Sequence, residues 1–207
     1  MMTFRETWQK FLPIIPLAGA ILALPASDAD AADAYRIRPG STTIAFSVDH
    51  LGLFQTEGDF TAFDGSLILD LDDPSRSRVD VRVETGSVEV ESDEAMAMLR
   101  SDDYFDSGDF PEMRFKADHV TSLGDGKVEI DGDLTIRGVT RRQTLQAELT
   151  DRRFDPAAGG EVANFIVTGK VDRVGFGMVA DRGFVSDDVD LRIISYIRLV
   201  GDDVAAR

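Results

Sequence analysis

The chain has 207 residues and a formal net charge of −16 at pH 7, with 38 acidic against 22 basic side chains. This excess of negative charge argues against nucleic-acid binding and against attachment to an anionic membrane by charge. The sequence contains no cysteine, which excludes disulfides and thiolate chemistry. The fold must therefore be stabilised by burial of apolar surface.

The first part of the chain, 1–34, has the pattern of a secretory signal peptide. A weakly basic start precedes the apolar stretch 11–24, which is shorter than the roughly 20 residues that a membrane-spanning helix requires. Small residues follow, so cleavage is expected after Ala31 or Ala34. We therefore expect export to the periplasm and one mature domain over residues 35–200. An uncleaved N-terminal anchor is the alternative.

Beyond the leader, apolar and polar residues alternate in most segments, most strictly in 79–84. Successive side chains of a strand point to opposite faces, so this pattern predicts a wall with a dry inside and a wet outside. Turn signals separate eight predicted strands, at 42–48, 58–71, 78–88, 112–121, 127–136, 142–151, 162–173 and 188–199. The last of them mixes apolar residues on both faces, which predicts a bulge or burial on both sides.

One helix is predicted in the long connection between the third and fourth strands. Ser92 can cap it, acidic residues follow in its first turn, and Met96 and Leu99 share a face. These elements predict an all-β fold, an eight-stranded antiparallel barrel with one short helix in a connection that can close a mouth. Composition leaves open whether the interior is a filled core or a pocket.

Residues with catalytic or metal-binding chemistry form no recognisable motif. Neither His50 nor His119 lies in a metal or nucleophile pattern, and the acid-rich turns lack the spacing of a calcium loop. We expect no catalytic residue, no metal site and no catalytic cofactor.

Several motifs together resemble the YceI-like family of exported lipid-binding proteins. The most specific is the run Gly-Asp-Leu-Thr-Ile-Arg-Gly-Val-Thr at 132–140, and the resemblance covers essentially all of 35–199. The other segments that carry it are 48–52, 58–65, 99–106, 110–115, 176–178 and 185–189.

The resemblance implies an elongated lipocalin-like barrel that holds a long polyisoprenoid, such as an isoprenoid quinone, in its lumen. Two positions depart from the family pattern: Met98 stands where a histidine is usual, and Gly175 where an acidic residue is frequent. His50 is retained and is the best candidate for a polar contact. The expected ligand-binding residues are Phe46, Val48, His50, Leu53, Phe60, Phe63, Met96, Leu99, Phe105, Met113, Phe115, Phe165, Phe176 and Met178.

A non-enzymatic carrier or store of isoprenoid lipid is the first hypothesis. One alternative is a barrel enzyme that acts on a lipid-like substrate through His50 and a carboxylate such as Asp49. Another is a stress-related envelope protein that acts through partner proteins. The first hypothesis leaves room for a homodimer and for transient contact with a membrane or with membrane redox proteins.

Overall fold

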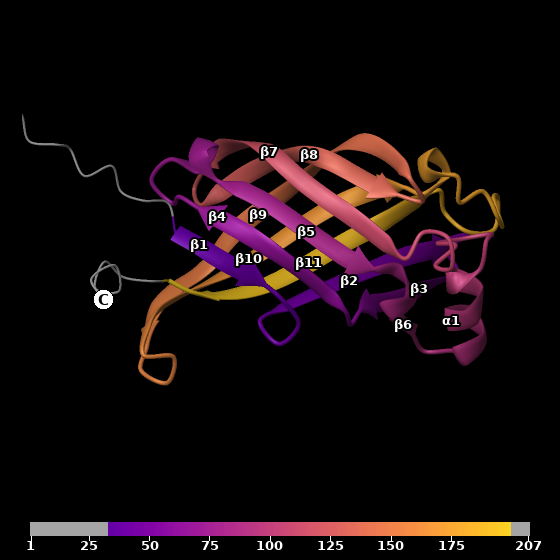
Figure 1. The fold of residues 1–207 in the computed structure, drawn as a ribbon, viewed down its shortest axis with the longest axis horizontal. Helices are drawn as coiled ribbons and strands as arrows, with labels where there is room; N and C mark the ends of the chain where they lie inside the picture. Colours follow the sequence, from indigo (N-terminus) through magenta and orange to yellow (C-terminus); the bar gives the residue numbers. More distant parts are fainter. Residues whose placement is uncertain (1–32, 200–207) are drawn as a thin grey trace, which may run out of the picture. The chain divides into compact units, whose positions relative to one another are not determined.

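The computed structural model describes residues 33–199, in which one α-helix accompanies a single antiparallel β-sheet (Figure 1). The strands are β1 Asp33–Ile37, β2 Thr42–His50, β3 Phe54–Phe60, β4 Phe63–Leu69, β5 Arg78–Glu84, β6 Val88–Val90, β7 Glu112–Gly124, β8 Lys127–Ile136, β9 Val139–Asp155, β10 Gly160–Asp172 and β11 Asp188–Arg198. The helix is α1 Asp93–Arg100, and three 3-10 turns are η1 Pro74–Arg76, η2 Thr85–Ser87 and η3 Val174–Phe176.

The predicted signal peptide, 1–34, lies outside the described residues except for its last two positions, which begin β1. Within the described part of the chain, no helix is both long and apolar enough to cross a membrane.

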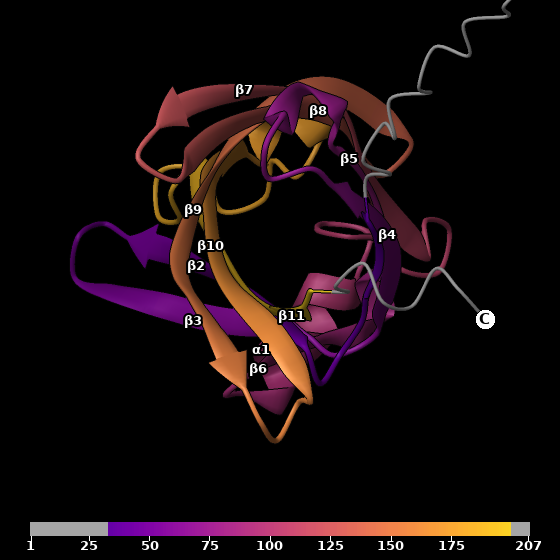
Figure 2. The same ribbon diagram turned by 90° about the vertical axis from the view of Figure 1, so that its left-hand side faces the viewer.

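The strands are hydrogen-bonded in the order β1-β4-β5-β7-β8-β9-β10-β11-β2-β3-β6, and every pair is antiparallel. The pairing of β11 with β2 brings the C-terminal strand against the N-terminal part of the wall. Viewed along the barrel axis, the strands form a ring (Figure 2). The predicted all-β antiparallel barrel is confirmed.

The structure has eleven strands where eight were predicted, because three of the eight chain paths are interrupted. β1 and β2 form one path, β3 and β4 a second, and β5 and β6 a third. Hydrogen bonds continue across one break, from the Thr61 amide to Ser87 O at 3.2 Å and from the Glu84 amide to Ala62 O at 3.0 Å. The ring therefore closes through eight paths even though its strands number eleven.

The break between β3 and β4 has a cause in the sequence. Phe60 and Phe63 are both buried, with 5% and 8% of their surface exposed. Residues three apart cannot face the same side of a regular strand, whose side chains alternate with a period of two. The chain must bend at Thr61 and Ala62 to bury both rings, so the predicted strand 58–71 is divided there.

The alternation of inward and outward side chains is confirmed along most strands. In β5, Val79, Val81 and Val83 all face the interior, where they line a cavity or join its walls. The prediction for the last strand was wrong, because β11 keeps an unbroken register with both neighbours. Its outward residues Ile194 and Tyr196 are simply exposed, by 47% and 37%.

The predicted helix is confirmed as α1. The Ser92 hydroxyl accepts a hydrogen bond from the Ala95 amide at 3.3 Å, which caps the helix as its sequence indicates. Arg100 in the last turn donates to Val88 O at 2.9 Å, and Leu99 packs on the cluster around Phe60. These contacts hold α1 and the connection after it at one end of the barrel, the far end in Figure 2.

Candidate functional site

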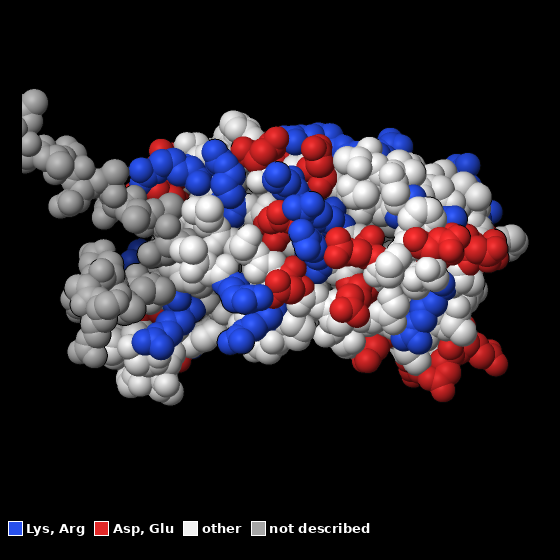
Figure 3. All heavy atoms as spheres, viewed as in Figure 1, with Lys and Arg blue, Asp and Glu red and all other residues white. Residues whose placement is uncertain are grey.

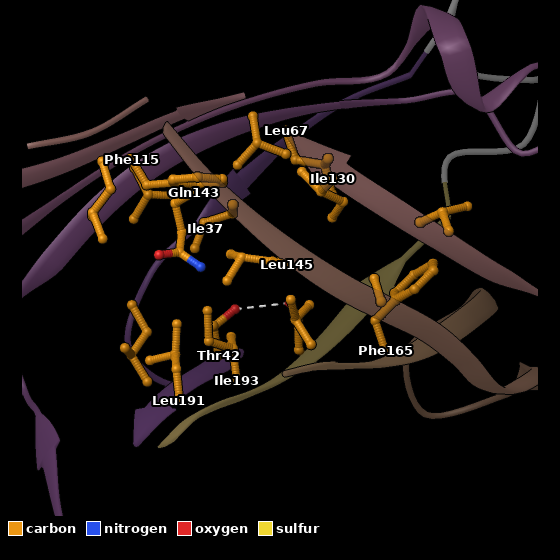
Figure 4. A pocket seen from close by; sticks show the side chains of 18 of the residues that line it. Ile37, Thr42, Leu67, Phe115, Ile130, Gln143, Leu145, Phe165, Leu191 and Ile193 are labelled. Carbon is orange, nitrogen blue, oxygen red and sulfur yellow. Dashed lines mark hydrogen bonds between the residues drawn. The ribbon is translucent and has the colours of Figure 1, made fainter. Parts of the chain in front are cut away.

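An internal cavity of about 540 Å³ lies inside the barrel, surrounded by the inward faces of the strands (Figure 4). Its walls are mostly Ile, Leu, Val and Phe side chains from β2, β4, β5 and β7 to β11. Ligand pockets usually measure about 300–1,000 Å³ and are lined in this way. The interior is therefore a hollow apolar pocket with packed clusters around it.

The cavity is elongated along the strands. Met113 and Ser122 both line it and lie nine positions apart on β7, about 30 Å at roughly 3.3 Å per residue. Lining residues come from both ends of the barrel, from Leu71 at one end to Val185 at the other. Such a shape fits an extended chain better than a compact ring system.

The two ends of the cavity differ in exposure. At the α1 end its lining includes Arg173, Tyr104 and Met178, which are only 3%, 5% and 5% exposed. At the opposite end the lining includes exposed turn residues such as Asp72 and Asp125, beside the buried Asp70. The cavity is thus closed at the α1 end and opens between the turns at the other.

A buried arginine holds the connection 174–187 across the closed end. The Arg173 guanidinium donates to the carbonyl oxygens of Met178 at 2.8 Å, Ala180 at 2.7 Å, Val185 at 3.1 Å and Ser186 at 2.8 Å. A buried charge is costly unless it is hydrogen-bonded, and these carbonyls supply the bonds. Arg173 therefore organises this connection into a plug.

Tyr104 joins the connection between α1 and β7 to the same plug. Its phenolic O–H donates to Asp181 Oδ2 at 2.7 Å, and the Arg137 guanidinium donates to Tyr104 O at 2.8 Å. Burial, together with the hydrogen bond to Asp181, raises the pKa of Tyr104 to about 12. The phenol is neutral at physiological pH and acts as a fixed donor.

The open end contains one buried carboxylate. Asp70 is 7% exposed, and its Oδ1 accepts hydrogen bonds from the amides of Asp73 at 2.7 Å and Asp72 at 3.1 Å. These bonds, with Asp73 as the main contributor, and the ion pair with Arg76 lower the pKa of Asp70, although burial opposes them. The acid-rich turn is a backbone clamp beside the opening, and no cluster of metal-ligating residues occurs in the described chain.

A few polar side chains interrupt the apolar lining midway along the barrel (Figure 4). The hydroxyls of Thr42 and Ser195 are hydrogen-bonded to each other at 2.9 Å. Gln143 Nε2 donates to Thr144 O at 2.9 Å and to Lys170 O at 3.0 Å, which bridges β9 and β10. Because these groups bond within the wall, the lumen stays compatible with a hydrocarbon chain.

Most of the sequence-predicted binding residues are brought together on the cavity wall. These are Phe46, Val48, Phe60, Leu99, Phe105, Met113, Phe115, Phe165 and Met178. Phe63 and Phe176 are instead buried in the packed clusters behind the wall, and Met96 lies half-buried on α1. Leu53 is 79% exposed on the connection between β2 and β3. Contact between these residues and a ligand stays a prediction.

His50 lies outside the cavity, at the end of β2. Its Nε2 is hydrogen-bonded to Thr56 Oγ1 at 2.9 Å, and its ring stacks on Phe54 with centroids 4.4 Å apart. The Asp49 carboxylate accepts from the Gly52 amide instead of facing the imidazole. The two side chains do not form the acid–base pair that the enzyme hypothesis requires.

Met98 and Gly175 lie at the closed end, and neither lines the cavity. A side chain at Gly175 would meet the Arg141 guanidinium, whose Nη1 lies 2.5 Å from the position of a Cβ. Arg173, Tyr104 and Gln143 were missed as site residues, because their partners are distant in sequence or are backbone atoms. Only the burial of Tyr104 had a sequence signal, its aromatic character.

Comparison with known proteins agrees with this architecture. A UPF0312 protein of Photorhabdus laumondii is 39% identical over 178 residues, which cover 85% of this chain and 91% of that protein. The crystal structure of the Campylobacter jejuni YceI protein superposes with a TM-score of 0.66 at 25% identity, covering 74% of this chain and 90% of that one.

A more distant structure shares the fold. A polyisoprenoid-binding domain from Saccharophagus degradans, implicated in plant cell wall breakdown, gives a TM-score of 0.52 at 12% identity, over 77% of this chain and 94% of that domain. The model of the YceI-like domain matches residues 35–194. The chain belongs to the YceI-like family.

Proposed function

We propose that the protein is an exported, non-enzymatic lipid-binding protein of the periplasm. It holds a long isoprenoid chain, such as an isoprenoid quinone or a polyprenyl lipid, inside the barrel for storage or transport. The observation that carries this proposal is the elongated apolar cavity. Burial contributes about 0.8 kcal/mol per methylene, so a tail of several isoprene units binds without any charged group or cofactor.

Two comparisons support the proposal. The family relationship joins the chain to proteins of the same architecture, and the Saccharophagus degradans domain of that architecture is described as polyisoprenoid-binding. The sealed α1 end is consistent with one chain end being held inside while the other remains near the opening.

Adjacent isoleucines on β11 provide a matched test. Ile193 lines the cavity, whereas Ile194 is 47% exposed on the outer face. Ile193→Trp adds bulk inside the tube and is expected to weaken binding of a polyprenol at least tenfold. Ile194→Trp adds the same bulk outside and should leave affinity unchanged.

Binding is measured by titration with a fluorescent polyprenol, and native mass spectrometry identifies lipid retained through purification. Equal affinity of both tryptophan variants and the wild-type protein would contradict a ligand inside the barrel. His50→Ala addresses the enzyme alternative: a carrier retains tail binding, and an enzyme loses turnover.

A role through partner proteins is the second candidate function. It is favoured by the exposure of Leu51, Leu53 and Phe54 around the β2–β3 connection, by 62%, 79% and 61%. A cavity-filling variant such as Ile193→Trp should leave that role intact, which separates the two candidates.

A further inference from the structure

We propose that the open end of the barrel is a membrane-docking surface through which the ligand passes directly between a bilayer and the cavity. This inference rests on the proposed function, since it states where a lipid enters. The surface, called the rim below, consists of the turns 70–77 and 122–127 and the hairpin 152–160. A tail that crosses at a docked rim never has to be exposed to water.

The rim carries large apolar side chains that no packing in the barrel requires. Phe154 is 65% exposed, Leu123 54% and Leu71 36%, and each comes from a different segment of the rim. Leu71 also lines the cavity itself. Exposed apolar groups around an opening are suited to insertion into the interfacial region of a bilayer.

A register shift directs Phe154 toward the opening. Leu149 lines the cavity opposite Phe165, but the pairing of β9 with β10 shifts at the next position, so that Asp151 lies opposite Asn164. Such a bulge turns the following side chains to the other face. Arg152 consequently lines the cavity, and Phe154, two residues further, shares its face.

The acidic charge of the protein is concentrated away from the rim. The rim contains five acidic and four basic residues, so its net charge is close to zero. Two of its cations form ion pairs with neighbouring acids, Arg76 with Asp70 and Arg152 with Glu161. Around β6 and α1, Glu89, Glu91, Asp93 and Glu94 form no ion pair with any described residue. On the face drawn in Figure 3, acidic side chains gather toward the α1 end. A rim-first approach therefore minimises repulsion from an anionic bilayer, which the net charge alone does not reveal.

The closed end is also partly apolar, and it serves as the internal control. Phe184 is 69% exposed and Leu51 62%, values close to those of Phe154 and Leu123. A bilayer at that end would meet the surrounding acids and would be separated from the cavity by the Arg173 and Tyr104 hydrogen bonds. Insertion there gives the ligand no route to the lumen.

The test compares two matched double variants with the wild-type protein. The rim variant is Phe154→Ser with Leu123→Ser, and the control is Phe184→Ser with Leu51→Ser. Binding to phosphatidylcholine vesicles that contain phosphatidylglycerol is measured by co-sedimentation. Transfer of a fluorescent polyprenyl lipid between vesicles and equilibrium binding of a short polyprenol in solution are measured separately, and circular dichroism verifies folding.

The rim variant is expected to bind vesicles about tenfold more weakly, because it loses two inserted apolar side chains, and to transfer lipid correspondingly more slowly. Its equilibrium binding of polyprenol should equal that of the wild-type protein, and the control should match the wild type throughout. Loss of vesicle binding in the control alone, or unchanged vesicle binding in the rim variant, would overturn the proposal. Absence of polyprenol binding by the wild-type protein would instead refute the proposed function, and the vesicle assay would still report on docking.

Discussion

The phenolic O–H of Tyr104 and Oδ2 of Asp181 are 2.7 Å apart, and this hydrogen bond joins two connections that are 77 residues apart in sequence. One connection follows α1, and the other follows η3. Together the two connections close the inner end of the cavity. A stronger hydrogen bond between them therefore keeps water out of the lumen more effectively.

Tyr104→Phe should remove the bond while keeping the ring that packs in the interior. We expect the free energy of unfolding to fall by about 1 kcal/mol, the usual contribution of one hydrogen bond. Urea denaturation at neutral pH measures this change. Asp181 is exposed and can be solvated, so a loss of several kcal/mol would indicate that the bond does more than fasten the two connections.

The same pair predicts a dependence of stability on alkaline pH. The folded-state pKa of Tyr104 is raised to about 12, above an unfolded value near 10. A group with a raised folded-state pKa contributes its full stability below the unfolded value and loses it as the pH rises through the folded value. The stability difference between wild type and Tyr104→Phe should therefore shrink between about pH 10 and 12, in denaturation curves recorded across that range.

Arg173→Met should be among the most destabilising substitutions in the protein. It leaves the carbonyl oxygens of Met178, Ala180, Val185 and Ser186 without their shared donor. A buried carbonyl oxygen left without a hydrogen-bond donor costs about 1–3 kcal/mol, and here four of them share one donor. Arg173→Lys keeps the charge but not the planar fork, so it should recover only part of the loss.

Thermal denaturation and amide hydrogen exchange of residues 174–187 measure these effects. Exchange in this segment should accelerate more than exchange in β9 or β10. Uniform acceleration over the whole barrel would mean that Arg173 supports the fold in general and not the closed end in particular.

Asp70→Asn tests the carboxylate clamp beside the opening. The backbone amide of Asp73 and the Arg76 guanidinium lower the pKa of Asp70 in the folded state. A carboxyl group with a lowered folded-state pKa contributes stability above its unfolded value, and this contribution disappears as the pH falls through the folded value. The variant should be less stable than wild type at pH 7, and the difference should begin to shrink below about pH 4 and disappear only once the pH is below the lowered folded-state pKa of Asp70.

The measurement is a set of denaturation curves at several pH values. Asp72→Asn provides the matched control, because Asp72 is exposed on the same turn and its side chain forms no hydrogen bond or ion pair with the described residues. An equal pH-dependent loss in the control would assign the effect to net charge and not to the clamp.

Gly132→Ala tests the close approach of β8 to β7. A Cβ at this position would lie 2.6 Å from Lys116 O and 2.8 Å from Ala117 Cα, in a place where the backbone cannot yield easily. Overpacking of this kind costs about 1–3 kcal/mol. We expect a lower melting temperature with an unchanged far-ultraviolet circular dichroism spectrum, whereas Gly108→Ala, in open space on an exposed connection, should change neither.

The wall of the barrel could be predicted from sequence because its signal is local. Val79, Val81 and Val83 alternate with charged residues, and that alternation alone determines which side faces inward. Many residues that line the cavity could be identified from the same alternation of inward and outward side chains. The mixed pattern of Ile194 and Tyr196 was misleading, since exposed apolar residues are common on protein surfaces.

The two ends of the barrel could not be predicted in this way. Arg173 follows a strand like any surface arginine, and only the folded connection places carbonyl oxygens around it. The end at which the cavity opens depends on which turns are covered by other segments. This covering is made by tertiary contacts between segments far apart in sequence. The break between Phe60 and Phe63 was not predicted, because their spacing of three forces a bend only when both rings are buried, and burial depends on the folded chain. The paired breaks in the neighbouring paths follow from the same contacts.

These breaks lie side by side in the barrel wall. Ile37 pairs with Gly65 on one side of the gap, and Ile44 pairs with Phe60 on the other. In the next path, Val83 pairs with Phe63 and Val88 pairs with Phe60. The N-terminal half of the wall therefore has a seam, whereas β7 to β11 are long unbroken strands whose pairing is interrupted only by local bulges. The bends that bury Phe60 and Phe63 are thus confined to one side of the tube, and the opposite side owes its shape to long paired strands.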